Sequence, residues 1–96
     1  MAMNISEEGM AITARFFKAL EFLVGSGRFR GIQTFTRKYS INRWNLLHVA
    51  ECPDKAVLKP EYIAILVRDF GISADWVLTG SGSMLSNGTD QTDQKN

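Results

Sequence analysis

The stretch of sequence that decides the fold is FTRKYSINRWNLLHV, residues 35–49. Phe35 and Tyr39 stand four residues apart, which places them on one face of a helix. Asn42 fits the N-cap of a second short helix. The inward face of that second helix is predicted to consist of Leu46, Val49 and Ala50. Two short helices joined by a few residues, with Ser40 in the turn, form a helix-turn-helix.

A longer helix is predicted before this motif, over residues 8–24. Its apolar stripe recurs at spacings of four, four and three residues and consists of Ile12, Phe16, Leu20 and Leu23. Ser6 fits the N-cap, and Gly25 and Gly27 end the helix. Phe29, in the short loop that follows, is expected to enter the core.

Two further helices are predicted after the motif. Pro53 stops the second motif helix, and Pro60 suits the first turn of the next one. The inward side of that fourth helix is marked by Tyr62, Ile63, Leu66, Val67 and Phe70. Gly71 ends it, and Ser73 caps a last short helix that Gly80 terminates. The chain is therefore expected to be all-α, with five helices.

Length and composition allow one modest core. A chain of 96 residues with 45% hydrophobic and 22% charged residues is typical of a globular domain. We assign residues 1–85 to this domain and residues 86–96, which lack large apolar side chains, to a disordered polar tail. The single cysteine indicates a reducing compartment. With no apolar run of ~20 residues and no signal-peptide pattern, we expect a cytoplasmic protein without a membrane partner.

The net charge of +1 hides an uneven distribution. Residues 28–59 hold seven Lys and Arg against two acidic residues, a net charge of +5, whereas residues 1–27 carry −1 and residues 60–96 carry −3. A basic middle suggests an anionic partner. A solvated charged face accounts for the same charge equally well.

In two places the chain resembles the phage-repressor (lambda-type, Xre) helix-turn-helix family. The first is the stretch 35–49, whose large apolar positions fall where the family's motif has them. The second is FGISADWVLTG, residues 70–80, which is similar to the family's closing signature of a helix that ends at Gly and a capped Asp-Trp helix. The resemblance spans roughly residues 11–85. It implies a five-helix repressor-like fold and a small prokaryotic or phage-derived transcriptional regulator that binds double-stranded DNA sequence-specifically.

Departures from the family's pattern bear on function. Ser40 stands where glycine is usual, and Thr36 replaces a small alanine. Ile32 stands where a phosphate-contacting glutamine is common, and Trp44 stands where a polar, base-contacting residue is normal. The loop 51–58 is a few residues longer than in the most compact members.

The resemblance implies that the second motif helix enters the major groove. The base-contact candidates are then Asn42, Arg43, Trp44, Asn45 and His48. Arg43 could fork onto the O6 and N7 atoms of guanine, and Asn45 could bond adenine or a phosphate. The phosphate-contact candidates are Gln33, Thr34, Lys55, Arg28 and Arg30. Arg37 and Lys38 are expected to form a solvated face.

Trp44 and Leu47 leave other interpretations open. They stand three residues apart on an adjoining, more outward face of the same helix. Trp44 folds back over the core edge, contacts a thymine methyl group, or belongs to a protein-binding patch. The alternative function is therefore a protein-interaction module that keeps the fold and uses the Trp44/Leu47 surface. Family members often bind DNA as dimers, so a homodimer is a further expected partner, and the sequence is equally compatible with a monomer.

Catalytic and metal-binding patterns are weak. His48 and Cys52 stand four residues apart, but two ligands are too few for a zinc site. No nucleophile–base pair, Gly-rich phosphate loop or carboxylate pair emerges. We therefore expect no enzyme activity, no cofactor, no metal and no small-molecule substrate.

Overall fold

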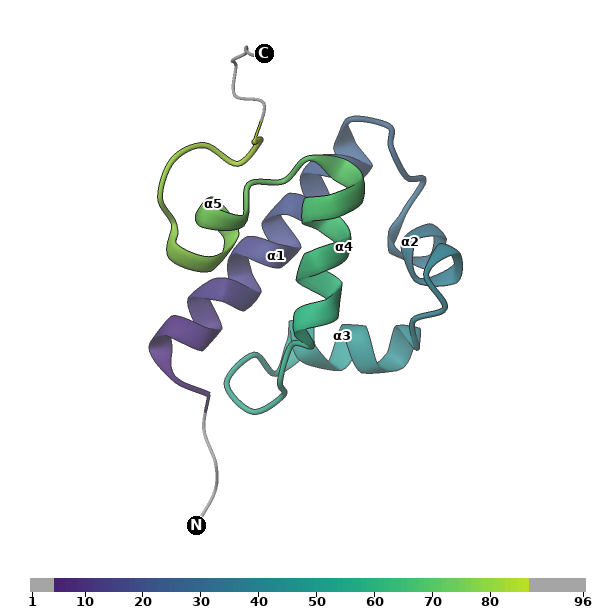
Figure 1. The fold of residues 1–96 in the computed structure, drawn as a ribbon. Coiled ribbons are helices and arrows are strands. Elements are labelled where there is room, and N and C mark those ends of the chain that lie inside the picture. Colours follow the sequence, from purple (N-terminus) through teal and green to yellow (C-terminus); the bar gives the residue numbers. More distant parts are fainter. Residues whose placement is uncertain (1–4, 87–96) are drawn as a thin grey trace. The chain divides into compact units, whose positions relative to one another are not determined.

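A computed structural model describes residues 5–86, and over this range the chain forms five α-helices (Figure 1). They are α1 (Glu7–Gly25), α2 (Ile32–Lys38), α3 (Arg43–Glu51), α4 (Pro60–Phe70) and α5 (Ala74–Thr79). The prediction of five helices is thereby confirmed. The chain divides into two compact units, with the boundary between Leu58 and Lys59. Apart from Ser86, the predicted tail lies outside the described residues.

Three helices begin at the N-caps that the sequence predicts. The side-chain oxygens of Ser6, Asn42 and Ser73 each accept a hydrogen bond from the backbone N–H three residues further on, at 3.0, 3.1 and 3.2 Å. Each bond satisfies one of the backbone donors that a helix start leaves without a partner in the helix. The fourth helix begins with Pro60 in its first turn, as predicted.

The long helix α1 ends in a Schellman turn. The N–H of Arg28 donates to the carbonyl of Leu23 at 2.9 Å, and the N–H of Gly27 donates to the carbonyl of Val24 at 3.1 Å. Gly27 has φ 88°, in the left-handed region that favours glycine. Glycine at this position lets the chain leave α1 without backbone strain.

The core of the first unit is built around Phe35. Its ring lies 6.4 Å from the ring of Phe16, 5.5 Å from that of Phe29 and 5.4 Å from that of Tyr39, measured between centroids. The buried aliphatic side chains of this unit are Ala19, Leu20, Leu23, Leu46 and Val49. Helix α3 contacts both α1 and α2. The prediction that Phe29 enters the core is confirmed.

Two residues that periodicity assigns to the inward faces lie at the margin of this core. Ile12 is half-buried, and Ala50 is exposed. The assignment of Ala50 to the inward face was wrong, because its side chain is exposed and lines a pocket. Thr13, which the apolar stripe of α1 leaves out, is buried instead.

In the second unit α4 and α5 contact each other across a short connection. Gly71 and Gly80 have φ 71° and 81° and end the two helices, as predicted. After α5 the chain turns back, so that Ile72 and Leu85 form an isolated antiparallel bridge. The N–H and hydroxyl of Ser86 both donate to the carbonyl of Gly71, at 2.7 and 2.9 Å. Folded contacts therefore extend one residue beyond the expected domain boundary.

The buried side chains of the second unit follow the predicted inward side of α4 in part. They are Tyr62, Ile63, Leu66, Ile72 and Val77. Val67 and Phe70, which the same pattern points inward, are half-buried. Over residues 5–86 no helix combines the length and the hydropathy needed to cross a membrane.

Candidate nucleic-acid interface

Helices α2 and α3 are joined by a turn of four residues, 39–42. The N–H of Ile41 donates to the carbonyl of Thr36 at 2.8 Å, and the N–H of Ser40 donates to the carbonyl of Arg37 at 3.4 Å. This is the Schellman pattern again. In Figure 1 α2 is seen almost along its axis and α3 from the side, so the two helices cross steeply. Two short helices joined by a short turn, as the sequence predicts for this stretch, are therefore present here.

Ser40 carries the conformational cost of this turn. Its φ is 56°, and it is the only non-glycine residue with a positive φ in the described part of the chain. A side chain with a Cβ costs about 1–2 kcal/mol in the left-handed helical region relative to the right-handed one. The turn therefore needs the conformation that glycine adopts most easily, and this sequence places serine there.

Thr36 is one of two buried polar residues among those described, with 4% of its surface exposed. Its hydroxyl donates to the carbonyl of Gln33 at 3.1 Å, one turn back along α2. A buried hydroxyl costs stability only where it lacks a partner. Threonine is therefore compatible with this position, where the sequence departs from the alanine of the repressor pattern.

The two sides of α3 differ sharply. Leu46 and Val49 are buried, Leu47 is half-buried, and the remaining side chains from Asn42 to Glu51 are exposed. The exposed set contains all five base-contact candidates: Asn42, Arg43, Trp44, Asn45 and His48. The structure thus brings these candidates together on the solvent-facing surface of one helix.

The side chain of Asn42 already makes a hydrogen bond within α3. Its Oδ1 accepts the N–H of Asn45 at 3.1 Å as the N-cap of α3. A bidentate contact with adenine uses the amide oxygen and the amide nitrogen together. Among the candidates, Asn42 therefore has a structural role that Arg43 and His48 do not share.

Trp44 projects into solvent. It is 73% exposed, the largest exposed fraction of any large hydrophobic side chain in the described residues. The interpretation that Trp44 folds back over the core edge was therefore wrong. The guanidinium carbon of Arg43 lies 5.8 Å from the centre of the Trp44 ring, within the range of a cation–π contact. The two side chains form one outward-facing pair at the start of α3, which we call the Arg43–Trp44 pair.

The phosphate-contact candidates are spread over three segments. Gln33 is exposed and Thr34 half-buried in the first turn of α2, and Arg28 and Arg30 are exposed in the loop before it. Lys55 is exposed in the loop after α3, where its N–H donates to the carbonyl of Cys52 at 3.0 Å. The same loop is hydrogen-bonded to the first described residue: the N–H of Ile5 donates to the carbonyl of Asp54 at 2.8 Å.

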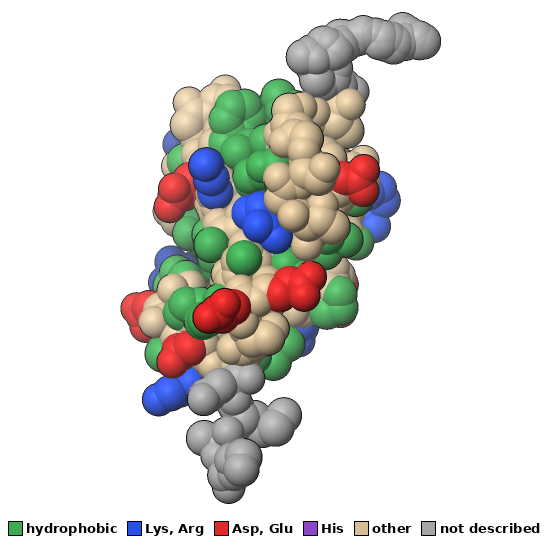
Figure 2. Space-filling model, turned by 90° about the vertical axis from the view of Figure 1, so that its left-hand side faces the viewer, with side chains coloured by type: hydrophobic (Ala, Val, Ile, Leu, Met, Phe, Trp, Pro, Cys, Tyr) green, Lys and Arg blue, Asp and Glu red, His purple; other side chains and the backbone are tan. Residues whose placement is uncertain are grey.

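Charge along α3 is polarised. Its first turn contains Arg43 and no acidic residue, whereas its last residue is Glu51. The loop beyond adds Asp54 next to Lys55, and all of these side chains are exposed. An anionic partner is therefore attracted more strongly to the beginning of α3 than to its end. On the face of the molecule in Figure 2, by contrast, basic and acidic side chains are interspersed with hydrophobic ones.

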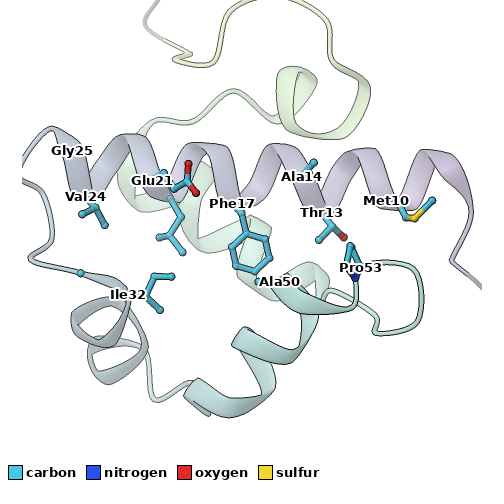
Figure 3. Close-up of a pocket in the computed structure, with 12 residues that line it drawn as sticks. Met10, Thr13, Ala14, Phe17, Glu21, Val24, Gly25, Ile32, Ala50 and Pro53 are labelled. Atoms are coloured by element: carbon cyan, nitrogen blue, oxygen red, sulfur yellow. The ribbon is translucent and has the colours of Figure 1, made fainter.

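The first unit also contains an apolar pocket of about 630 Å³ (Figure 3). It is lined by Met10, Thr13, Ala14, Phe17, Leu20, Glu21, Val24, Gly25, Gly31, Ile32, Ala50 and Pro53. In Figure 3 Val24 and Ile32 face each other at one end, and Phe17 reaches toward Ala50 in the middle. None of the DNA-contact candidates lines the pocket. Sequence reasoning missed it because these residues come from segments far apart in the chain.

The described residues contain no cluster of three or more His, Cys, Asp and Glu side chains that could hold a metal ion. Cys52 is a free, half-buried cysteine at the C-terminal end of α3. The outward face of α3 combines one exposed arginine, Arg43, with the exposed polar side chains of Asn42, Asn45 and His48. Protein-family models, curated proteins and solved structures give no significant match to this chain.

Proposed function

We propose that the chain is a sequence-specific double-stranded DNA-binding protein, a small prokaryotic or phage-derived transcriptional regulator with a repressor-like fold. Helix α3 enters the major groove, and its first turn meets the base edges. The observation that carries this proposal is the outward face of α3, where Arg43, Asn45 and His48 are all exposed while Leu46 and Val49 are buried. Helix-turn-helix proteins insert one short helix into the major groove of DNA. That helix is joined to its neighbour by a tight turn and lies at a steep angle to it.

Electrostatics favours the first turn of α3 as the end that approaches the bases. Arg43 lies there, and Glu51 lies at the other end. Exposed basic residues on both sides of the motif, Arg30 before it and Lys55 after it, are suited to the phosphate backbones that flank the groove. Phosphate contacts supply most of the affinity and fix orientation, and base contacts supply the sequence preference.

A second candidate function is a protein-interaction module that keeps the same arrangement. The observation that favours it is the 73% exposure of Trp44, beside the half-buried Leu47. Tryptophan is enriched among the residues that dominate protein interfaces. In this function the outward face of α3 binds a partner protein, and DNA affinity is absent.

Selection of bound sequences from a random duplex pool tests the first candidate. The full chain is immobilised, and the enriched duplex is then titrated from low to physiological salt. We expect one enriched sequence and a steep loss of affinity with salt, with each neutralised phosphate contributing about −0.9 to the logarithmic slope. No enrichment at low salt, or an affinity that does not respond to salt, contradicts DNA binding.

Matched variants separate base contacts from phosphate contacts. Arg43→Ala is expected to cost about 1–3 kcal/mol of affinity and to relax preference at one base pair. Lys55→Ala is expected to lower the affinity for all duplexes alike. The slope of log affinity against log salt should become shallower by about 0.9, the contribution of one phosphate contact. Arg37→Ala removes another exposed arginine, in the last turn of α2, and serves as the control, with base preference unchanged. If the protein-interaction function holds, neither the natural chain nor any of the three variants binds duplex DNA.

A further inference from the structure

The Arg43–Trp44 pair offers two kinds of contact side by side. Arg43 supplies a planar fork of N–H donors, and Trp44 supplies an apolar ring that is 73% exposed. In the major groove guanine presents two acceptors, O6 and N7, and thymine presents a C5-methyl group. Only a C5-methylated pyrimidine places an apolar group in that groove. The chemistry of the pair is therefore complementary to a guanine next to a methylated pyrimidine.

The position of the pair on α3 fits this contact. Arg43 and Trp44 are the first two residues of the helix, directly after the Asn42 cap. Side chains at the N-terminal end of a recognition helix are those that reach the base edges. The neighbouring exposed side chains, Asn45 and His48, are polar, so Trp44 is the only large apolar group that this end of the helix presents.

The contact between the two side chains gives the ring a defined place. With the guanidinium carbon 5.8 Å from the ring centre, the cation is attracted to the negative face of the indole. Consecutive residues of a helix point about 100° apart, but the contact between Arg43 and Trp44 holds the indole close to the guanidinium. When Arg43 binds a guanine, the indole therefore lies near the neighbouring base. We propose that Trp44 is a specificity-determining residue that binds the C5-methyl group of a thymine or 5-methylcytosine adjacent to the guanine bound by Arg43. This inference rests on the proposed DNA-binding function.

Replacing thymine by uracil tests it, because this change removes the methyl group and leaves every hydrogen-bonding atom in place. Each thymine of the enriched duplex is replaced singly, and the dissociation constant is measured for the natural chain and for Trp44→Ala. Burial of one methyl group corresponds to about a fourfold change in affinity. We expect uracil at one position, next to a guanine, to weaken the natural chain about fourfold and to leave Trp44→Ala unaffected.

Three controls keep this result specific. Val57→Ala removes another exposed apolar side chain, 69% exposed, in the loop after α3, and should retain the full discrimination between thymine and uracil. Trp44→Phe keeps an apolar ring and should retain part of it. Replacing the responsive T·A pair by C·G or by 5-methylcytosine·G distinguishes the sources of the methyl group. If 5-methylcytosine·G restores the affinity and C·G does not, the methyl group alone is sufficient for the contact. If both pairs weaken binding equally, the site accepts thymine and not 5-methylcytosine.

The possible failures are distinguishable. An enriched duplex in which no uracil substitution changes affinity overturns the role of Trp44 and leaves DNA binding intact. The same follows if Trp44→Ala discriminates against uracil as strongly as the natural chain. Absence of any enriched duplex overturns the proposed function and this inference with it. Circular dichroism of Trp44→Ala should show an unchanged helix content, since the side chain is outside the core.

Discussion

Leu46 and Trp44 are large apolar side chains two residues apart on α3, yet they lie in opposite environments. Leu46 is fully buried, whereas Trp44 is 73% exposed. Two residues correspond to about 200° around an α-helix, so the two side chains point in nearly opposite directions. The inward side holds α3 on the core of the first unit. The outward side contributes little to the fold and is available for a partner, so the two sides should respond differently to substitution.

The largest expected effect is on the inward side. Leu46→Ala should lower the free energy of unfolding by about 2–5 kcal/mol, because it removes apolar contacts and leaves a cavity. Urea-induced unfolding, followed by circular dichroism, measures this loss. Leu46→Met, which conserves volume, should cost less than about 1.5 kcal/mol. A loss below about 1 kcal/mol for Leu46→Ala would contradict the buried role of this side.

The cap at the start of α3 should have the next largest effect. Asn42→Ala removes the acceptor for the N–H of Asn45 and should cost about 0.5–2 kcal/mol. Asn45→Ala, a change of the same kind one turn further on, removes an exposed side chain and should be close to neutral. Equal effects of the two substitutions in urea unfolding would show that the cap bond does not stabilise α3.

The turn before α3 allows a gain in stability. Ser40→Gly should stabilise the protein by about 1 kcal/mol, because glycine adopts the observed φ of 56° without the Cβ penalty. Gly27→Ala is the matched reverse change in the Schellman turn of α1. It has φ 88° and no neighbouring atom within 4 Å of an added Cβ, so it should destabilise by a comparable amount. Thermal unfolding of both variants measures the pair. A drop in the midpoint for Ser40→Gly contradicts the argument.

The smallest expected effect is on the outward side. Trp44→Ala should change the free energy of unfolding by no more than about 0.5 kcal/mol, as is usual for exposed positions. Urea unfolding beside Leu46→Ala gives the comparison directly. A loss of several kcal/mol would show that Trp44 packs on the protein in solution.

Local chemistry made the helix limits predictable. Ser6, Asn42 and Ser73 cap helices because their short side chains reach the first free N–H groups, which depends only on residues three apart. Gly71 and Gly80 end helices because they adopt positive φ without strain. The turn around Ser40 was predictable for a different reason: Ser40 is not a glycine, but the residues on both sides of it define two helices.

The orientation of single side chains was less predictable. Periodicity in a helix of nine residues does not say how far the packed face extends, so it left open whether Trp44 covers the core edge, and it assigned Ala50 to the inward face. The amino-acid sequence by itself determined five helices, three of their N-caps and a basic segment of two short helices joined by a turn, because these depend on neighbouring residues. Only the tertiary structure decided that Trp44 faces solvent beside Arg43 and that Phe17 and Ile32 line one pocket. Those features depend on how helices distant in the chain pack, and no local pattern encodes that.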